Sequence, residues 1–360
     1  MAMILWATIG SGLILVGYYY YYFNVLNHPI TPGIKPNTHP VTLLICVKNG
    51  IEEVRQNLSS WCDQDYPDYE VVIIDDHSTD CLCGYLQKIQ NFYPHLSCYK
   101  APVVIKDSPG KKAALLYGLK QARSPWILMT DADCRPASRF WIREMMGART
   151  RPATQCIIGY SPLERTSALQ SRWLAFETSW VALQYLGFAR KGEAYMGVGR
   201  NLLILRDVAL AADLHPELAS GDDDFLVQSV DPKRVEICVH PDSWVFTSAP
   251  EHFIAWITRK TRHSQTSMLY PSKIKTKLII FHGAMALFYA GLLSLIIINS
   301  VWLIALIWIT YSGILFPVRR NLSNNLGIPR NVWIWTEPLV LMSYCVILFR
   351  MFFQSKQRWA

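Results

Sequence analysis

Short apolar runs alternate with longer polar stretches between residues 41 and 130. VTLLICV at 41–47, EVVII at 70–74 and WILMT at 126–130 each have the length and the β-branched composition of one strand. The stretches between them are compatible with helices, and residues 111–122 are a helix candidate. Strands that are apolar on both faces and alternate with helices predict a mostly parallel α/β sheet.

A much longer apolar run stands at the start of the chain. Residues 3–23 contain no charged residue, and 21 residues in a helix cover about 30 Å, the thickness of the hydrocarbon layer. We therefore expect an N-terminal transmembrane helix within residues 1–25. A cleavable signal peptide is less favoured because no basic residue precedes the run and no small-residue cleavage site follows it. The five consecutive tyrosines at 18–22 predict an interfacial aromatic belt.

A proline-rich linker and a second apolar block define the remaining organisation. Residues 28–40 hold four prolines, so we place a linker at 26–40 and the catalytic domain at 41–270. The region 271–360 is expected to be membrane-associated, with helices at about 278–297, 301–316 and 332–353. Glu337 and Pro338 interrupt the last run, which leaves a fourth span or an interfacial segment as alternatives.

The basic residues of this region bear on its orientation. Arg319, Arg320 and Arg330 place the loop after the second apolar block in the cytosol, together with the catalytic domain. Four spans would then put the carboxyl tail on the opposite side. That tail is also basic, with Arg350, Lys356 and Arg358, so the two indications conflict.

Composition supports a membrane protein. The chain is 51% hydrophobic and only 17% charged, with a mean hydropathy of +0.15, whereas soluble domains carry about 25% charged residues. The net charge of +8 is concentrated in residues 259–277, directly before an apolar run. This position favours an anionic membrane surface or an anionic substrate, and no nucleic-acid motif accompanies it.

The nine cysteines do not form a disulfide or zinc framework. Their number is odd and no CxxC spacing occurs, so we interpret them as reduced cytosolic thiols that fill the core. Cys81 and Cys83 are close in sequence, but no histidine lies in ligand register with them.

Acidic residues follow the predicted strands at three places. Ligands of open α/β sheets bind where the strands end, so these residues are candidates for chemistry. Carboxylates at such an edge can hold the Mg²⁺ or Mn²⁺ that neutralises a nucleotide diphosphate, although aspartates also cap helices and turns. The candidates are Asp75 and Asp76, Asp131 and Asp133, and Asp222, Asp223 and Asp224.

The ordered set of motifs between residues 41 and 265 resembles the family 2 glycosyltransferases with the GT-A fold. The motifs are VTLLICVKNGIEEV, EVVIIDDHSTD, GKKAALLYGL, MTDADCRP, YMGVGRN, SGDDDF and RKTRH. The resemblance implies a Rossmann-like, nucleotide-sugar-binding domain carried by N-terminal and C-terminal transmembrane helices. It also implies that the enzyme is of the membrane-bound, non-processive type.

The resemblance carries roles to individual residues on the donor side. It implies that Asp75 or Asp76 contacts the base, that Lys111 or Lys112 approaches the donor, and that Asp131 touches the ribose and diphosphate. It further implies a metal site at Asp131 and Asp133, with Asp133 as the ligand. The nucleotide pocket is implied for Val47, Lys48, Asn49 and Glu52.

The same resemblance implies a catalytic base in SGDDDF. Asp222 aligns with the family's catalytic aspartate, but Gly221 replaces the usual glutamate, so Asp223 and Asp224 remain candidates. A base must approach the acceptor hydroxyl to hydrogen-bond distance. The alternative is an ordinary helix start with an acidic first turn.

Two further motifs complete the implied site. RKTRH stands where many membrane-bound members carry Gln-x-x-Arg-Trp, so Arg262 keeps the phosphate-binding cation while Arg259 and His263 replace the glutamine and the tryptophan. A basic membrane-surface helix is the alternative. Acceptor-side roles are implied for Gly197, Gly199, Arg200 and Asn201, with a plain tight turn as the alternative.

These inferences lead to an inverting, metal-dependent transfer from a nucleotide-sugar donor to a lipid or lipid-linked acceptor. The predicted partners are the donor, a lipid acceptor and the bilayer, and the predicted cofactor is Mn²⁺ or Mg²⁺. Three alternatives remain: a processive polysaccharide synthase, a non-catalytic scaffold with a nucleotide-sugar fold, and a soluble nucleotidyltransferase. The missing tryptophan argues against the first, the filled acidic positions against the second, and the apolar segments against the third.

Overall fold

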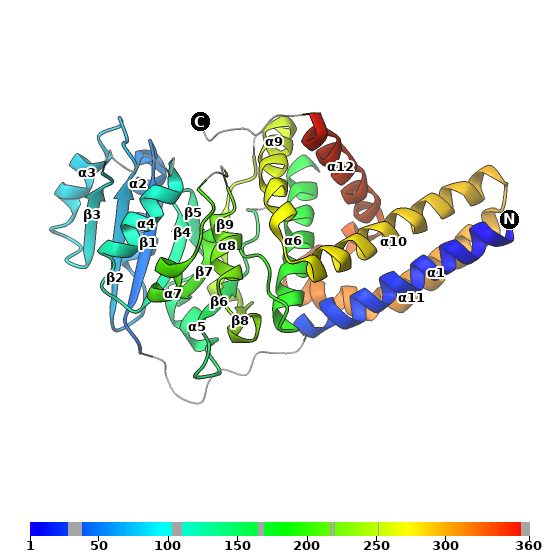
Figure 1. Ribbon diagram of the computed structural model, residues 1–360, viewed down its shortest axis with the longest axis horizontal. Coiled ribbons are helices and arrows are strands. Elements are labelled where there is room, and N and C mark those ends of the chain that lie inside the picture. The colour runs from blue at the N-terminus through cyan, green and yellow to red at the C-terminus, as the bar shows by residue number, and fades with distance from the viewer. Residues whose placement is uncertain are drawn as a thin grey trace.

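A computed structural model describes residues 1–27, 38–102, 110–164, 169–216, 218, 220–250 and 252–353. Figure 1 shows an α/β part joined to a bundle of long helices, with the amino terminus at the far tip of the bundle. Residues 28–37, which form most of the predicted proline-rich linker, lie outside the described residues.

The α/β part is built on a seven-stranded sheet. Its order is β3-β2-β1-β4-β7-β6-β8, and only the pairs that β7 makes with β4 and β6 are antiparallel. The mostly parallel sheet predicted from the sequence is thereby confirmed. The strands are β1 (Val41–Val47), β2 (Tyr69–Asp75), β3 (Leu96–Lys100), β4 (Trp126–Asp131), β6 (Cys156–Gly159), β7 (Leu202–Leu205) and β8 (Val235–Cys238). A separate antiparallel pair joins β5 (Cys134–Pro136) to β9 (Val245–Thr247).

Both faces of this sheet are buried, as the apolar strand runs require. Leu43 and Ile45 of β1 pack into one core, whereas Leu44, on the opposite face, packs into a second core. This second core continues without a break into the helix bundle, where it includes Phe281 and Phe288. The helices of this part are α2 (Ile51–Cys62), α3 (Leu82–Ile89), α4 (Lys111–Gln121), α5 (Trp141–Gly147), α6 (Leu169–Arg190), α7 (Arg206–Ala211), α8 (Asp222–Gln228) and α9 (Phe253–Ser264).

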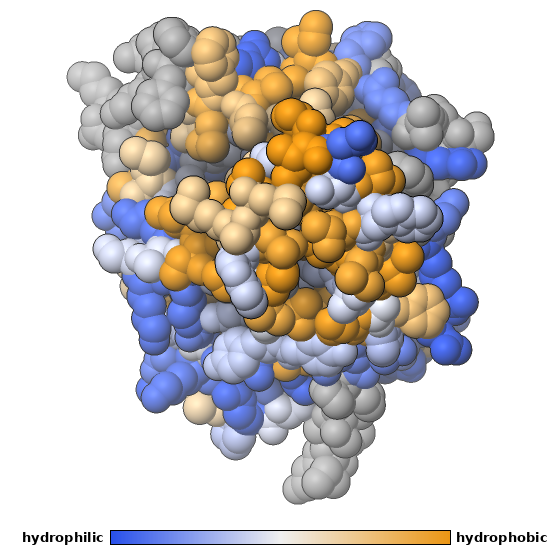
Figure 2. Space-filling view, turned by 90° about the vertical axis from the view of Figure 1, so that its right-hand side faces the viewer, coloured by the Kyte–Doolittle hydropathy of each residue, from blue (hydrophilic) through white to orange (hydrophobic). Residues whose placement is uncertain are grey.

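Among the described residues, three helices of the bundle are long and apolar enough to cross a membrane. They are α1 (Ala2–Tyr18), which continues as tighter and wider turns to Asn27, α10 (Ser272–Ile297) and α11 (Val301–Asn325). Helices α1 and α10 approach closely at small residues: a side chain at Gly291 would meet Thr8 Oγ1 at 2.0 Å. Figure 2 views the bundle end-on and shows apolar side chains gathered over it. Integral membrane placement is thus compatible with the fold.

The last helix, α12 (Trp333–Phe353), departs from the bundle. It packs against α9 and α6, and within the described residues it is not among the helices long and apolar enough to span. Its Arg350 donates a hydrogen bond to Thr258 of α9 at 3.3 Å. Glu337, near its start, is buried and accepts hydrogen bonds from Arg319 and Tyr19. Lys356 and Arg358 lie outside the described residues.

The tyrosine run differs from the predicted interfacial belt. Tyr19 and Tyr22 are buried inside the protein, while Tyr20 and Tyr21 are exposed. The hydroxyl of Tyr22 donates to Glu193 at 2.9 Å, and Glu193 also pairs with Lys277 of α10. The run therefore serves largely to attach α1 to the catalytic part. Which tyrosines face the protein depends on their position around the helix, and composition alone does not show this.

Candidate active site

The candidate site is assembled at the carboxyl edge of the parallel strands. In the sheet register, Val47 of β1 lies beside Asp75 of β2, and Cys46 lies beside Asp131 of β4. The two aspartates therefore flank the end of the central strand β1. This is the edge at which open α/β sheets bind ligands.

Lys111 and Asp131 form an ion pair at the centre of this edge. Lys111 is the first residue of α4, and its Nζ lies 2.5 Å from Asp131 Oδ1. Burial alone would raise the pKa of Asp131, but Lys111, Arg200 and Arg259 outweigh it and lower the pKa. Asp131 is therefore a carboxylate at neutral pH.

Lys112, next in sequence, has a different position. Its Nζ is buried and donates to the carbonyl oxygens of Leu214 and His215, at 2.7 Å and 2.8 Å. Lys112 thus holds the loop after α7. Of the two lysines that the resemblance left open, Lys111 is the one that lies at the carboxylates.

The oxygen donors beside Asp131 fit a hard divalent cation. Ligand atoms of Asp131, Asp133 and Cys134 all lie within 4.8 Å of one another. Asp133 accepts hydrogen bonds from Thr247 Oγ1 at 3.1 Å and from Cys134 Sγ at 3.3 Å, which orient its carboxylate. Burial raises the pKa of the Cys134 thiol well above its usual range, so it stays protonated. Two carboxylates without a thiolate suit Mg²⁺ or Mn²⁺ rather than zinc.

The three aspartates of SGDDDF are separated by the geometry of α8. Gly221 has φ +92°, and a Cβ there would lie 2.2 Å from Thr266, so the glutamate of the family pattern does not fit this backbone. Asp224 is buried and accepts hydrogen bonds from Thr266 at 2.9 Å and Tyr270 at 2.7 Å. Burial raises the pKa of Asp224 well above its usual range. Asp224 is therefore an anchor of α8.

Asp222 and Asp223 lie nearer to the charges of the site. Asp223 Oδ2 accepts the backbone N–H of Gly199 at 3.0 Å. Burial, and then the neighbouring carboxylate of Asp222, raise the pKa of Asp223 to about 6. Asp222 interacts electrostatically with both Lys111 and Arg262. The first turn of α8 is thus acidic, as the alternative interpretation expected, and it also faces the cations of the site.

The loop before β7 supports this acidic turn from the other side. A side chain at Gly197 would meet Val227 at 2.8 Å, and Gly199 lies against Asp223. Arg200 donates to Ser161 Oγ at 2.6 Å and contributes to lowering the pKa of Asp131. Asn201 has a different position: it is fully buried. Its side chain bonds to Trp141 and to the carbonyl oxygens of Tyr160 and Ser243.

Helix α9 brings a row of basic residues to the same region. Burial, and then Arg259, lower the pKa of Arg262, whose buried Nε has no hydrogen-bond partner among the described residues. Burial together with Arg259 and Arg262 lowers the pKa of His263 well below its usual range, so the imidazole is neutral. An anion would relieve the mutual repulsion of these two arginines.

The residues predicted for the nucleotide pocket have different surroundings. Asn49 has φ +52°, and its side chain accepts from Thr79 N at 2.8 Å, which shapes the turn after β1 where Val47 and Lys48 also lie. The carboxylate of Asp75 accepts hydrogen bonds from Ser78 N and Cys83 Sγ. Asp76 Oδ2, in contrast, is buried without a hydrogen-bond partner among the described residues. Glu52 points to solvent and pairs with Arg55 at 2.6 Å.

Several residues that position the site carry no signal in the motifs. Thr247 orients Asp133, and Thr266 and Tyr270 hold Asp224. Lys260 of α9 pairs at 2.8 Å with Glu177, a fully buried residue of α6. A glutamate inside the apolar stretch LAFETSW was the one visible signal of this last contact.

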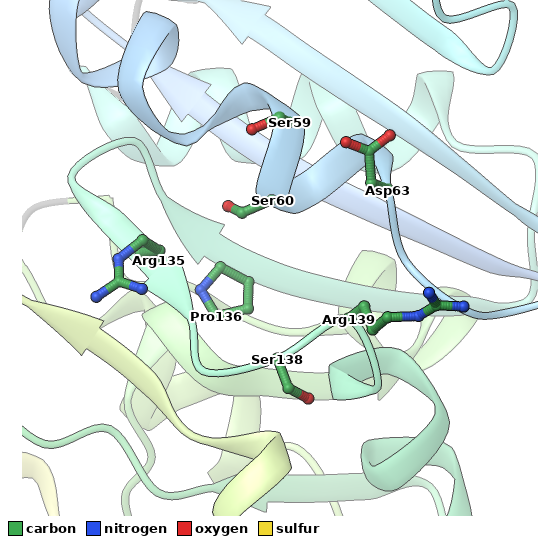
Figure 3. A pocket seen from close by; sticks show the side chains of 7 residues that line it. All are labelled: Ser59, Ser60, Asp63, Arg135, Pro136, Ser138 and Arg139. Atoms are coloured by element: carbon green, nitrogen blue, oxygen red, sulfur yellow. The ribbon is translucent and has the colours of Figure 1, made fainter.

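A hollow of about 260 Å³ lies elsewhere, between the end of α2 and β5. Figure 3 shows its lining, which includes Ser59, Asp63, Arg135 and Arg139. It contains none of the predicted site residues.

Comparison with known proteins shows which family and which solved structures the chain resembles. The model of glycosyl transferase family 2 matches residues 42–210. No curated protein matches the chain in sequence.

The mannosyltransferase PcManGT from Pyrobaculum calidifontis, solved in complex with GDP-Man and Mn²⁺, has a similar structure and is 18% identical to this chain. The alignment covers 97% of this chain and 98% of that one, with a TM-score of 0.62. TarS 1-349 from S. aureus, solved in complex with UDP-GlcNAc, is 13% identical over 86% of this chain and 90% of that one, with a TM-score of 0.43. The similarity to PcManGT confirms the predicted fold.

Proposed function

We propose that this chain, whose residues 42–210 belong to glycosyl transferase family 2, transfers a sugar from a nucleotide-sugar donor to a lipid or lipid-linked acceptor. Family membership makes the chain a glycosyltransferase. The acceptor, the metal dependence, the stereochemistry and the role of each residue belong to the proposal.

One observation carries the proposal: opposite charges converge at one edge of the sheet. The ionised Asp131 pairs with Lys111, and Asp133 lies next to Asp131. Asp222 interacts electrostatically with Lys111 and Arg262. Transfer from a nucleotide-sugar donor needs cations near the phosphates of the diphosphate. It also needs a carboxylate near the acceptor hydroxyl that attacks the sugar.

Asp222 is proposed as the general base. It takes the proton of the acceptor hydroxyl while the hydroxyl oxygen attacks the anomeric carbon and the bond to the diphosphate breaks. A single displacement of this kind inverts the anomeric configuration. Asp223, held by Gly199, and Asp224, held by Tyr270, position the turn that carries the base.

Arg262 and Lys111 are proposed to receive the negative charge that develops on the departing diphosphate. Arg262 has a buried Nε without a partner among the described residues, so a phosphate oxygen would satisfy it. Asp131 and Asp133 would hold Mg²⁺ or Mn²⁺, which supplies further neutralisation of the diphosphate when bound. Asp76, with its unpartnered carboxylate oxygen, is the proposed contact to the base.

The lipid acceptor is proposed from the way the catalytic part meets the bundle. One hydrophobic core runs from the sheet into the candidate spans, and α9, which carries Arg259 and Arg262, packs against α12. An acceptor that enters from the bilayer would reach this edge directly. We further propose that the catalytic domain faces the cytosol, because the exposed Arg320 lies near the end of α11 next to the catalytic part and the exposed Arg330 follows that end.

The test is release of nucleoside diphosphate from a panel of nucleotide sugars by detergent-purified protein. The panel includes GDP-mannose and UDP-N-acetylglucosamine, with Mn²⁺, Mg²⁺ or EDTA, and with or without a membrane lipid extract. We expect metal-dependent release that rises with lipid. Asp133→Ala should abolish metal-dependent donor binding, and Asp222→Asn should keep donor binding but stop transfer. Near-normal turnover by Asp222→Asn would contradict its role as base, and no release under any condition would favour the scaffold.

A further inference from the structure

Helix α12 has one face on which large apolar side chains are exposed. Leu339, Met342, Val346 and Phe349 are 45%, 64%, 46% and 66% exposed, and their spacing of three, four and three residues puts them on one side of the helix. The opposite side, with Val340 and Ile347, is buried against the protein. Four exposed large apolar side chains in one row mark an interaction surface.

Exposed apolar side chains also occur on α9. At the start of α9, which packs against α12, Phe253 and Ile254 are 43% and 71% exposed. Helix α12 follows α11, a candidate span, after a connection of a few residues at 326–332. In Figure 1, α12 leaves the bundle at the end next to the catalytic part and lies beside α9.

The ends of the spans on this side carry exposed basic residues. Lys273 at the start of α10 has a side chain that is 78% exposed, and Arg320 and Arg330 near the end of α11 are also exposed. Cations at this depth meet the anionic headgroups of a leaflet. The apolar face of α12 thus lies on a helix that begins a few residues after a candidate span, at the end of the bundle where these basic residues are exposed.

We propose that α12 lies in the plane of the membrane surface, on the side of the catalytic domain, with this apolar face among the lipid acyl chains. A helix with one apolar face and one protein-facing side suits the boundary between headgroups and acyl chains. Arg350, near the end of α12, bonds to Thr258 of α9, which keeps that end next to the catalytic part.

Two consequences follow for the molecule. The carboxyl end of α12 stays on the same side of the membrane as the catalytic domain, which removes the conflict between four spans and a basic tail. Helix α9, with its arginines, packs against a helix that lies on lipid. The proposal does not depend on the catalytic activity, so it can be tested whether or not transfer is observed.

The test measures depth at two positions seven residues apart on the apolar face. Cys81 and Cys345, the two exposed cysteines, are replaced by serine, and Met342→Cys and Phe349→Cys are each labelled with an environment-sensitive fluorophore. The protein is placed in vesicles of phosphatidylcholine and phosphatidylglycerol that contain nitroxide lipids, with the quencher near the headgroup or deep in the chain. Leu339→Cys and Val346→Cys, also seven residues apart, form a second pair.

Seven residues of helix cover about 10 Å, so a span would place the two labels at clearly different depths. The matched control is Ile280→Cys and Leu287→Cys in α10, where we expect that difference. On α12 we expect both labels at equal depth and stronger quenching by the shallow nitroxide. A depth difference like that of α10, or labels that report water and no quenching, would overturn the proposal.

Discussion

Replacing Asp223 by asparagine should stabilise the folded protein at neutral pH. Burial and the adjacent Asp222 raise the pKa of Asp223 to about 6 from a usual value of 3.8. A buried acid with a raised pKa binds its proton more tightly in the folded chain than in the unfolded chain. Its contribution is therefore most favourable below pH 4 and becomes a cost as the pH rises through 6.

The size of this cost follows from the shift. Two pKa units correspond to about 3 kcal/mol in the free energy of unfolding, which is lost between pH 4 and pH 6. Asparagine carries no charge and keeps an oxygen that can accept the N–H of Gly199, so Asp223→Asn should recover most of this amount at pH 7.5. For a domain of about 200 residues, the thermal midpoint would rise by roughly 6–12 °C at most.

The assay is thermal unfolding followed by tryptophan fluorescence in detergent with EDTA, at pH 7.5 and at pH 4.5. The control is Asp207→Asn, whose carboxylate is 88% exposed and whose removal should change the midpoint by little. We expect stabilisation by Asp223→Asn at pH 7.5 that shrinks clearly at pH 4.5. Equal midpoints for Asp223→Asn and the parent protein at pH 7.5, or a gain that does not depend on pH, would refute the reasoning.

Three further substitutions test the surroundings of the site. Lys111→Met should raise the KM for the donor roughly 10- to 100-fold, because a charge-assisted hydrogen bond is worth about 1.5–3 kcal/mol; an unchanged KM would remove Lys111 from the donor site. Arg262→Lys should lower kcat by roughly tenfold with a smaller change in KM, since an ammonium cannot meet phosphate bidentately; steady-state kinetics decide this. Glu177→Gln should lower the thermal midpoint by the equivalent of about 1.5–3 kcal/mol, because Lys260, whose side chain is 23% exposed, loses its charged partner, and the double variant with Lys260→Met should regain most of it. A double variant as unstable as the single one would show that the ion pair is not the cause.

The central strands and the acidic edge could be predicted from the sequence because their determinants are local. The run at 41–47 became β1 over Val41–Val47, and the run at 126–130 became β4, which ends at Asp131. A strand buried on both faces needs consecutive apolar residues, and a parallel sheet brings the strand ends to one edge. The spacing of the motifs then indicated which acidic residues meet there.

The motifs could not show which of two neighbouring candidate residues lies at the site. Lys111 and Lys112 are both basic, but successive helical residues point about 100° apart, so one reaches Asp131 and the other the carbonyl of Leu214. The same reasoning applies to Gly199 and Asn201, of which the first faces Asp223 and the second is buried in the core. The position of a side chain depends on the phase of its element, which the packing of distant segments fixes.

In the membrane region, too, some features follow from the local sequence and others from the packing of distant segments. Length and hydropathy indicated α1, α10 and α11, although α10 and α11 extend beyond the apolar residues to Ser272 and Asn325. Whether residues 332–353 span the membrane depends on how α12 packs against α9 and α6. Its apolar content alone left both alternatives open.

The most direct measurement of the central claim follows a radiolabelled sugar from its nucleotide into a product that extracts with organic solvent. Purified protein in vesicles would receive the donor that supports diphosphate release, with Mn²⁺ and membrane lipid extract, beside the Asp222→Asn variant. The account predicts label in the lipid phase from the parent protein and none above background from the variant. Label that stays in the aqueous phase, or equal transfer by the variant, would contradict it.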